Sequence, residues 1–360
     1  MTIQQRAPSI DLLRCPRSPA RTSSAAPRFG AKHAASAARP TLGRTAAGSG
    51  VPAGCRVGSV VACWFAALTL GALPSARLAA DEKPASLLAD GAGVERLADS
   101  FSFTEGPTAD AEGNVLFTDQ PNDRIMCWSV DGKLTTFLQP CGRSNGLYFD
   151  AKGNLWACAD EKNELWCIDP SGKVEVVVKD YQGKLLNGPN DLWIRPDGGI
   201  YFTDPFYKRP YWKRGPMEQD VQGVYFLAPD RKTLRRVVDD LAQPNGIIGT
   251  PDGKTLYVAD IRAGKTYAYD IQEDGSLAGK RLFCSMGSDG MTIDERGNVY
   301  LTGKGVTVFD PSGRKIEQID VPEPWTANVC FGGKDGRLLV ITASKGLYGV
   351  RMRVGRPKSS

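Results

Sequence analysis

The stretch PDGGIYFTD (residues 196–204) combines a tight turn with an apolar, alternating strand, and the chain repeats this form five more times. The other copies are AEGNVLFTD (111–119), AKGNLWACAD (151–160), PDGKTLYVAD (251–260), ERGNVYLTG (295–303) and KDGRLLVITA (334–343). Their turn glycines recur at broadly regular intervals, at Gly113, Gly153, Gly198, Gly253, Gly297 and Gly336. Repeats of roughly 40–50 residues with about four strands each are typical of propeller blades.

Most copies are followed by a second strand that ends in another turn, for example LWCIDPSG (165–172) and VTVFDPSG (306–313). No stretch keeps a helical period for more than one or two turns, so the pattern indicates an all-β protein. The sequence predicts a six-bladed β-propeller with an axial metal site, formed by residues 81–360 as one domain. A WD40 propeller does not fit, because its Gly-His and Trp-Asp signatures are missing.

Charge and histidine content exclude several classes of function. The 360 residues carry a net charge of +5, but residues 1–80 hold ten Lys/Arg and one acid, which leaves 35 bases and 39 acids in the rest. The predicted propeller is therefore slightly acidic and lacks the basic footprint of a nucleic-acid-binding protein. The single histidine, His33, lies within residues 1–80, so a Ser-His-Asp triad or a histidine zinc site in the propeller is excluded.

Residues 1–80 are predicted to be a low-complexity leader and a signal peptide. Residues 1–55 are rich in Ala, Arg, Ser and Pro, and an apolar run, VVACWFAALTLGAL, follows at 60–73. This run is short for a membrane span and has the length of a signal-peptide core. We expect cleavage near Ala80–Asp81, export to the periplasm or the medium, and no stable membrane anchor afterwards. A membrane anchor or an ordinary buried helix is the alternative.

One polar residue precedes every turn glycine by eight positions. The six residues are all carboxylates or carboxamides: Glu105, Asn145, Asn190, Asn245, Asp289 and Asn328. Equivalent positions of a propeller are related by rotation about its axis, so we expect a ring of oxygen-bearing side chains near the channel. Tight Asn-Gly and Asp-Gly turns would explain single members of this set, but they do not explain Glu105 or Asn190 in the same register.

A ring of oxygen donors with two negative charges suits a hard divalent cation, Ca²⁺ before Mg²⁺ or Mn²⁺. Three further aspartates, Asp119, Asp204 and Asp260, come six or seven positions after the turn glycines and are expected to accept backbone hydrogen bonds at strand ends. The six cysteines from Cys127 to Cys330 match no metal or redox spacing. Buried free thiols are the preferred interpretation, with disulfide pairing as the alternative.

The chain resembles the SMP-30/gluconolactonase family, and its bacterial gluconolactonase-like branch in particular. The motifs that carry the resemblance are TEGP (104–107), PND (189–191), PNG (244–246), SDGM (288–291) and ANVCFGG (327–333), in the family's order over about residues 95–350. The resemblance implies a six-bladed propeller with one catalytic divalent cation on its axis, often Ca²⁺, with Mg²⁺, Mn²⁺ or Zn²⁺ as alternatives. It also implies hydrolysis of a gluconolactone-like sugar lactone to the aldonic acid.

The resemblance implies a role for each of four ring residues. Glu105, Asn245 and Asp289 would bind the metal, and Asn190 would contact metal and substrate. Asp289 is the expected proton acceptor, because it is the charged ring residue least needed as a pure ligand. The animal branch has an arginine at the position of Gly188 that holds sugar hydroxyls, so the resemblance does not fix the sugar.

Substrate contacts are expected from ring amides and from the insertion loop, Asp204–Gly215 (DPFYKRPYWKRG). The expected substrate-binding residues are Asn190, Asn187, Asn145, Tyr207 and Asn328. Phe206, Arg209, Tyr211, Trp212 and Trp325 are weaker candidates for the pocket wall.

Two other functions stay open at this point. One is a promiscuous aryl-ester or phosphotriester hydrolase that uses the same metal. The other is a non-catalytic propeller that binds a sugar or a protein. The expected partner is a small-molecule sugar lactone, with no nucleic acid, and the expected assembly is a monomer or a small homo-oligomer.

Overall fold

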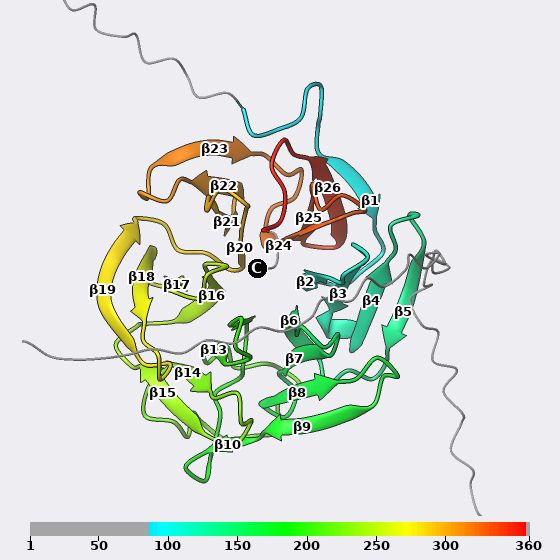
Figure 1. Cartoon of the computed structure of the whole chain (residues 1–360). Helices are drawn as coiled ribbons and strands as arrows, with labels where there is room; N and C mark the ends of the chain where they lie inside the picture. The colour runs from blue at the N-terminus through cyan, green and yellow to red at the C-terminus, as the bar shows by residue number, and fades with distance from the viewer. Residues whose placement is uncertain (1–85, 358–360) are drawn as a thin grey trace, which may run out of the picture. The chain divides into compact units, whose positions relative to one another are not determined.

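The computed structural model describes residues 86–357, and these residues form an all-β propeller (Figure 1). Six antiparallel four-stranded sheets surround a central axis, as the repeats predict. One short 3₁₀ helix, η1 (Gln120–Asn122), is the single helix of the described residues, and none of their helices could cross a membrane. The predicted leader, the apolar run and the cleavage position lie outside residues 86–357.

Each of the first five blades consists of consecutive strands, ordered from the axis outward. The first blade contains β2 (Thr104–Ala109), β3 (Val115–Asp119), β4 (Arg124–Trp128) and β5 (Leu134–Leu138). The second contains β6 (Ser144–Phe149), β7 (Leu155–Ala159), β8 (Glu164–Ile168) and β9 (Val174–Val178). The third contains β12 (Leu192–Ile194), β13 (Ile200–Asp204), β14 (Gly223–Leu227) and β15 (Leu234–Val238). The fourth contains β16 (Pro244–Gly249), β17 (Thr255–Asp260), β18 (Lys265–Ile271) and β19 (Leu277–Cys284). The fifth contains β20 (Met291–Ile293), β21 (Val299–Gly303), β22 (Gly305–Phe309) and β23 (Lys315–Ile319).

The sixth blade closes the ring with strands from both ends of the described chain. It contains β24 (Thr326–Gly332), β25 (Leu338–Ala343) and β26 (Gly346–Arg351), and its outer strand is β1 (Glu95–Ala98), which pairs antiparallel with β26. The two segments that would otherwise be free ends thus hydrogen-bond to each other. A small hairpin of β10 (Asp180–Tyr181) and β11 (Lys184–Leu185) lies between the second and third blades.

The turn glycines occupy the predicted positions between the first and second strand of each blade. All six have a positive φ, from +68° at Gly336 to +93° at Gly198. Residues with side chains rarely adopt this conformation, which accounts for glycine at every copy. The second strands that follow are fully buried in the first three blades and the fifth, and their Leu, Ile, Phe and Tyr side chains pack between adjacent blades.

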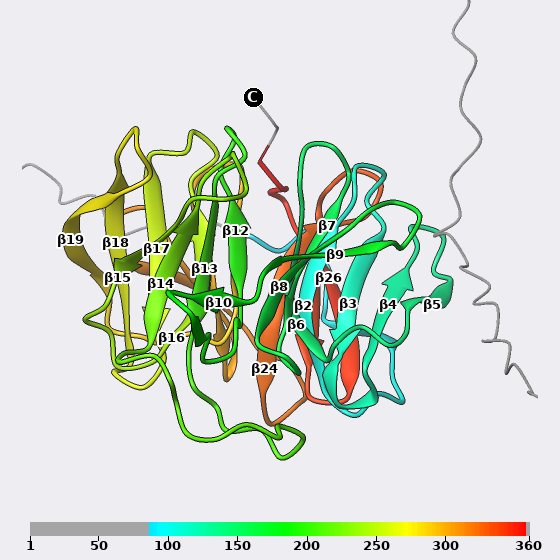
Figure 2. The same cartoon turned by 90° about the horizontal axis from the view of Figure 1, so that it is seen from below.

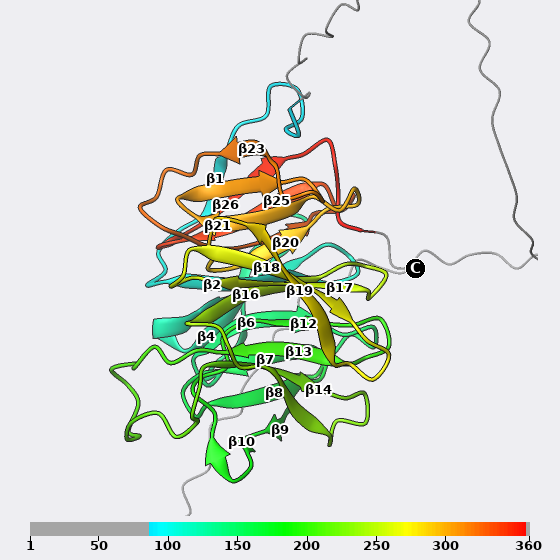
Figure 3. The same ribbon diagram turned by 90° about the vertical axis from the view of Figure 1, so that its left-hand side faces the viewer.

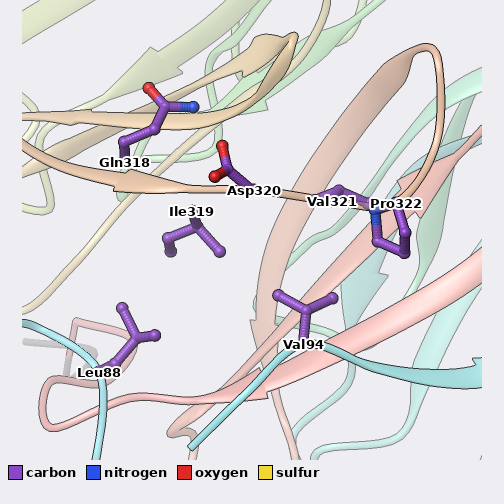
Figure 4. A pocket seen from close by; sticks show the side chains of 7 residues that line it. All are labelled: Leu88, Val94, Gln318, Ile319, Asp320, Val321 and Pro322. Carbon is purple, nitrogen blue, oxygen red and sulfur yellow. The ribbon is translucent and has the colours of Figure 1, made fainter.

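The free-thiol interpretation is confirmed for five cysteines, Cys141, Cys158, Cys167, Cys284 and Cys330, which are free and buried. A surface groove of about 430 Å³ lies at the outer rim beside β23 and is lined by residues such as Leu88, Val94 and Pro322 (Figure 4). This groove is therefore remote from the axis. The insertion loop connects β13 to β14 and extends beyond the strands on one face, whereas the C-terminal segment lies on the opposite face (Figures 2 and 3).

Candidate functional site

The six predicted ring residues all lie at the start of the innermost strands. Glu105, Asn145, Asn245 and Asn328 are among the first three residues of β2, β6, β16 and β24, and Asn190 and Asp289 each lie two positions before β12 and β20. Asp289 is half-buried, and the other five are at most 5 % exposed. The offset of eight positions from each turn glycine therefore identifies equivalent positions at the inner strands of all six blades.

A chain of hydrogen bonds joins the fourth and fifth blades at the axis. The Asn245 amide nitrogen Nδ2 donates to Asp289 Oδ1 at 2.8 Å and to the Tyr207 hydroxyl at 2.6 Å. The Trp325 indole nitrogen donates to the other Asp289 oxygen at 2.6 Å. Asp289 is thus oriented through both carboxylate oxygens, and the insertion loop reaches the ring through Tyr207.

The two ring carboxylates both have raised pKa values, chiefly because they are buried. Burial raises the pKa of Glu105 well above its usual range, and the nearby charge of Asp289 raises it further. Burial also raises the pKa of Asp289, against the hydrogen bonds from Trp325 and Asn245 and the positive charge of Arg209. Two carboxylates that repel each other in a buried place are stabilised in the ionised form by a bound cation.

The donor set fits a hard divalent cation. The side-chain oxygen of Asn245 is buried and has no hydrogen-bond partner among the described residues, and an orphaned buried acceptor of this kind is rare. Glu105 uses one carboxylate oxygen for the backbone N–H of Gly106, at 3.0 Å. Within residues 86–357 no three His, Cys, Asp or Glu side chains gather as a metal site. Any ion at the ring would therefore be held by two carboxylates and amide oxygens.

A third buried carboxylate, Asp191, lies beside the ring. Asn328 Nδ2 donates to it at 3.3 Å and the Leu192 N–H at 2.9 Å, while burial raises the pKa of Asp191 to about 7. Asp191 and Asn328 line a cavity of about 50 Å³ between the inner strands. Asp191 was not among the site residues predicted from the sequence. The available signal was that Asn190 is followed by a carboxylate where four other ring residues are followed by glycine.

Those four glycines allow neighbouring blades to approach each other at the axis. A Cβ on Gly106 would lie 2.1 Å from the Asn145 carbonyl oxygen, and one on Gly146 would lie 2.6 Å from that of Asn190. A Cβ on Gly246 would lie 2.8 Å from the Asp289 carbonyl oxygen, and one on Gly290 would lie 1.9 Å from the Asn328 side chain. Of the four, Gly106 alone has a positive φ, of +43°. The tight-turn explanation therefore fails for three of them, and close backbone approach replaces it.

The other predicted substrate residues have mixed surroundings. Asn145 and Asn190 accept hydrogen bonds through their backbone carbonyls, from Thr118 and Gly146 respectively. The Asn187 amide nitrogen donates to the carbonyls of Asp204 and Val221 at the two ends of the β13–β14 connection. Its side-chain oxygen is buried and has no hydrogen-bond partner among the described residues. Their contacts with a substrate, like that of Asn328, stay predictions.

The strand-end aspartates accept backbone hydrogen bonds, as predicted. Asp119, Asp204 and Asp260 each bind two consecutive N–H groups in the segment that leads into their own blade's inner strand. The corresponding residue of the second blade, Asp160, was missed although it follows Gly153 by seven positions, as Asp260 follows Gly253. The lead-in segment of the second blade is bound instead by Asp123 of the first blade, which accepts from the N–H groups of Cys141 and Arg143.

Asp160 instead holds the insertion loop. Its carboxylate oxygen Oδ2 accepts from Arg209 Nε at 2.9 Å and from the Tyr211 hydroxyl, and its carbonyl accepts from the Trp212 indole at 2.8 Å. A Cβ on Gly188 would lie 2.7 Å from Asp160 Oδ1 and 2.9 Å from the Trp212 ring. Glycine at 188 thus makes room for the folded loop.

The comparisons with known proteins agree with this architecture. Residues 103–345 match the sequence profile of the SMP-30/Gluconolactonase/LRE-like region. A gluconolactonase of Zymomonas mobilis is 30 % identical over 295 residues, which cover 72 % of this chain and 81 % of the relative. The solved structure of a gluconolactonase from Xanthomonas campestris is 30 % identical, with a TM-score of 0.69 over 74 % of this chain and 91 % of the other. A lactonase, drp35, of Staphylococcus saprophyticus is 27 % identical over 61 % of this chain and 69 % of its own length. The chain belongs to the SMP-30/gluconolactonase/LRE-like family.

Proposed function

We propose that this protein is a metal-dependent lactonase that opens a gluconolactone-like sugar lactone to the aldonic acid, with Ca²⁺ as its first-choice cation. The observation that carries the proposal is the group formed by buried Glu105, half-buried Asp289 and the unpaired Asn245 oxygen at the start of the inner strands. Relatives named gluconolactonase and lactonase support the reaction class.

Glu105, Asn245 and Asp289 would hold the cation, with Asn190 beside them. A bound divalent cation polarises the lactone carbonyl and lowers the pKa of a water molecule. Asp289 accepts the proton of the attacking water on a carboxylate oxygen, and the hydrogen bonds from Asn245 and Trp325 keep that carboxylate in place. Glu105 would offset the positive charge of the cation without accepting a proton, because its side chain is more deeply buried than that of Asp289.

Tyr207 is suited to bind the substrate. Its hydroxyl oxygen accepts from Asn245, which leaves the hydroxyl proton free to donate to a ligand oxygen. Burial raises the pKa of Tyr207, so the hydroxyl stays protonated at neutral pH. Tyr207 can therefore orient a lactone next to Asp289.

A lactone panel tests the proposed function. Proton release is measured for gluconolactone, for other sugar lactones, and for an aryl ester and an aryl phosphotriester, with EDTA and with Ca²⁺, Mg²⁺, Mn²⁺ or Zn²⁺ added. We expect the highest kcat/KM for a sugar lactone, and loss of activity with EDTA that Ca²⁺ restores. Turnover confined to the aryl substrates, or background rates for every substrate, would refute the lactonase proposal.

We also propose export of the mature protein, on the basis of the leader in the sequence. N-terminal sequencing of protein purified from its native host should give a start near Asp81. Cytosolic protein that retains residues 1–55 would contradict it.

A further inference from the structure

We propose that Arg209 of the insertion loop is a specificity-determining residue, whose outer guanidinium edge binds a carboxylate of the ligand. The proposal rests on the proposed lactonase function. It implies that the site favours lactones that carry a carboxylate, and the aldonate product, over neutral compounds of the same size.

The outer edge of the Arg209 guanidinium is open. The side chain is 23 % exposed, its Nε is engaged by Asp160, and its plane lies over the Tyr207 ring at 5.0 Å from the centroid. No residue between 86 and 357 accepts a hydrogen bond from Arg209 Nη1 or Nη2. A fixed guanidinium thus presents two nitrogen donors without protein acceptors.

This open edge belongs to the axial site. Arg209 stacks on Tyr207, the Tyr207 hydroxyl binds Asn245 at 2.6 Å, and Asn245 binds Asp289 at 2.8 Å. A ligand bound at the ring would therefore lie within reach of the guanidinium.

In the second blade the strand-end aspartate, Asp160, binds Arg209 and not the lead-in segment of its own blade. Asp160 lies where the first, third and fourth blades use an aspartate to bind the lead-in segment, and Asp123 binds that segment of the second blade instead. The Asp160 carboxylate is buried and binds both Arg209 and Tyr211. Arg209 is thus pre-organised, so little side-chain entropy is lost when it binds a ligand.

The charge around Arg209 favours an anion. Residues 205–215 contain Lys208, Arg209, Lys213 and Arg214 and no acid. Arginine forms two parallel hydrogen bonds with a carboxylate, which are stronger than bonds to neutral hydroxyls. Asp160 neutralises one of these four charges by pairing with Arg209, so the loop keeps a net positive charge. A divalent cation on the ring would offset the charges of Glu105 and Asp289, and the side of the pocket near Arg209 would then attract a negative group.

The first test measures binding rather than turnover. D-gluconate and its neutral reduced counterpart, D-glucitol, are titrated calorimetrically into the Ca²⁺-loaded full chain. Arg209→Gln should weaken gluconate binding at least tenfold and change glucitol binding less than twofold, with Arg209→Lys in between. Lys213→Gln is the matched control, because Lys213 lies exposed on the same loop and loses the same charge. It should behave like the wild type.

The second test compares kcat/KM for an aldarolactone, which carries a carboxylate, with that for gluconolactone. Arg209→Gln should lower this ratio at least tenfold, while Arg209→Lys, which keeps the charge, lowers it less. An unchanged ratio, equal losses for gluconate and glucitol, or a wild-type protein that does not bind gluconate would overturn the role of Arg209. Failure of the wild type to hydrolyse any lactone would instead refute the proposed function.

Discussion

Replacement of Asp289 by asparagine tests the proposed proton acceptor most directly. Asp289 receives two hydrogen bonds, from Asn245 Nδ2 at 2.8 Å and from Trp325 Nε1 at 2.6 Å. Asparagine keeps the volume but has one acceptor oxygen, so one of the two donors faces an NH₂ group. Loss of a hydrogen bond to a charged acceptor costs about 1.5–3 kcal/mol.

A second effect opposes this cost. The substitution removes a buried negative charge that raises the pKa of Glu105. Relief of this repulsion stabilises the folded protein and so acts against the loss of the hydrogen bond. We therefore expect the metal-free variant to melt within a few degrees of the wild type, and its cation affinity to fall.

The effect on turnover should be much larger than the effect on folding. Removal of a general base lowers rates by about 10²–10⁴-fold. We expect Asp289→Asn, assayed by proton release at saturating Ca²⁺, to lose at least about 10²-fold in kcat, or about 2.7 kcal/mol of transition-state stabilisation. Asp131→Asn makes the same change on an exposed side chain and serves as the control. Near wild-type kcat in a folded, metal-saturated Asp289→Asn variant would refute the proposed mechanism.

Three further outcomes follow from the same structure. Ca²⁺ at a hundredfold excess over its dissociation constant should stabilise the protein by about 3 kcal/mol, and thermal melts that do not respond to EDTA or Ca²⁺ would exclude the axial cation. Gly106→Ala should destabilise the fold by about 2–4 kcal/mol in chemical denaturation, because its Cβ would lie 2.1 Å from the Asn145 carbonyl oxygen at a positive φ. The control Gly153→Ala has a positive φ but open space around the Cβ, and it should cost about 1–2 kcal/mol. Equal losses for the two variants would disprove the close-approach argument. Tyr207→Phe should lower kcat/KM about tenfold, the worth of one hydrogen bond, and should also lower the melting temperature modestly, because one N–H of the buried Asn245 amide loses its acceptor. An unchanged kcat/KM would remove Tyr207 from the substrate contacts.

The blade architecture could be predicted from the sequence because its determinants are local and repeated. A turn glycine with a positive φ and an alternating strand recur in each blade, and a fixed offset of eight positions then defines the start of each inner strand. Rotation about the axis brings these starts together, so Glu105, Asn245 and Asp289 could be placed in one ring without knowledge of any contact. The same offset carried no information on which of them touch each other.

The insertion loop could not be predicted in the same way, because its conformation depends on residues far away in the chain. Asp160 binds Arg209 across 49 positions, and Tyr207 binds Asn245 across 38. The sequence named Tyr207 as a substrate contact and Arg209 and Trp212 as candidates for the pocket wall. All three are half-buried, but the sequence did not indicate which residues hold them. One signal was available in the sequence, because Asp160 has the offset of a strand-end aspartate. In the structure Asp123 supplies the hydrogen-bond acceptor that the lead-in segment of the second blade requires. A repeated position whose structural role is filled by another residue is free to take a different partner, and here that partner is the arginine beside the axial site.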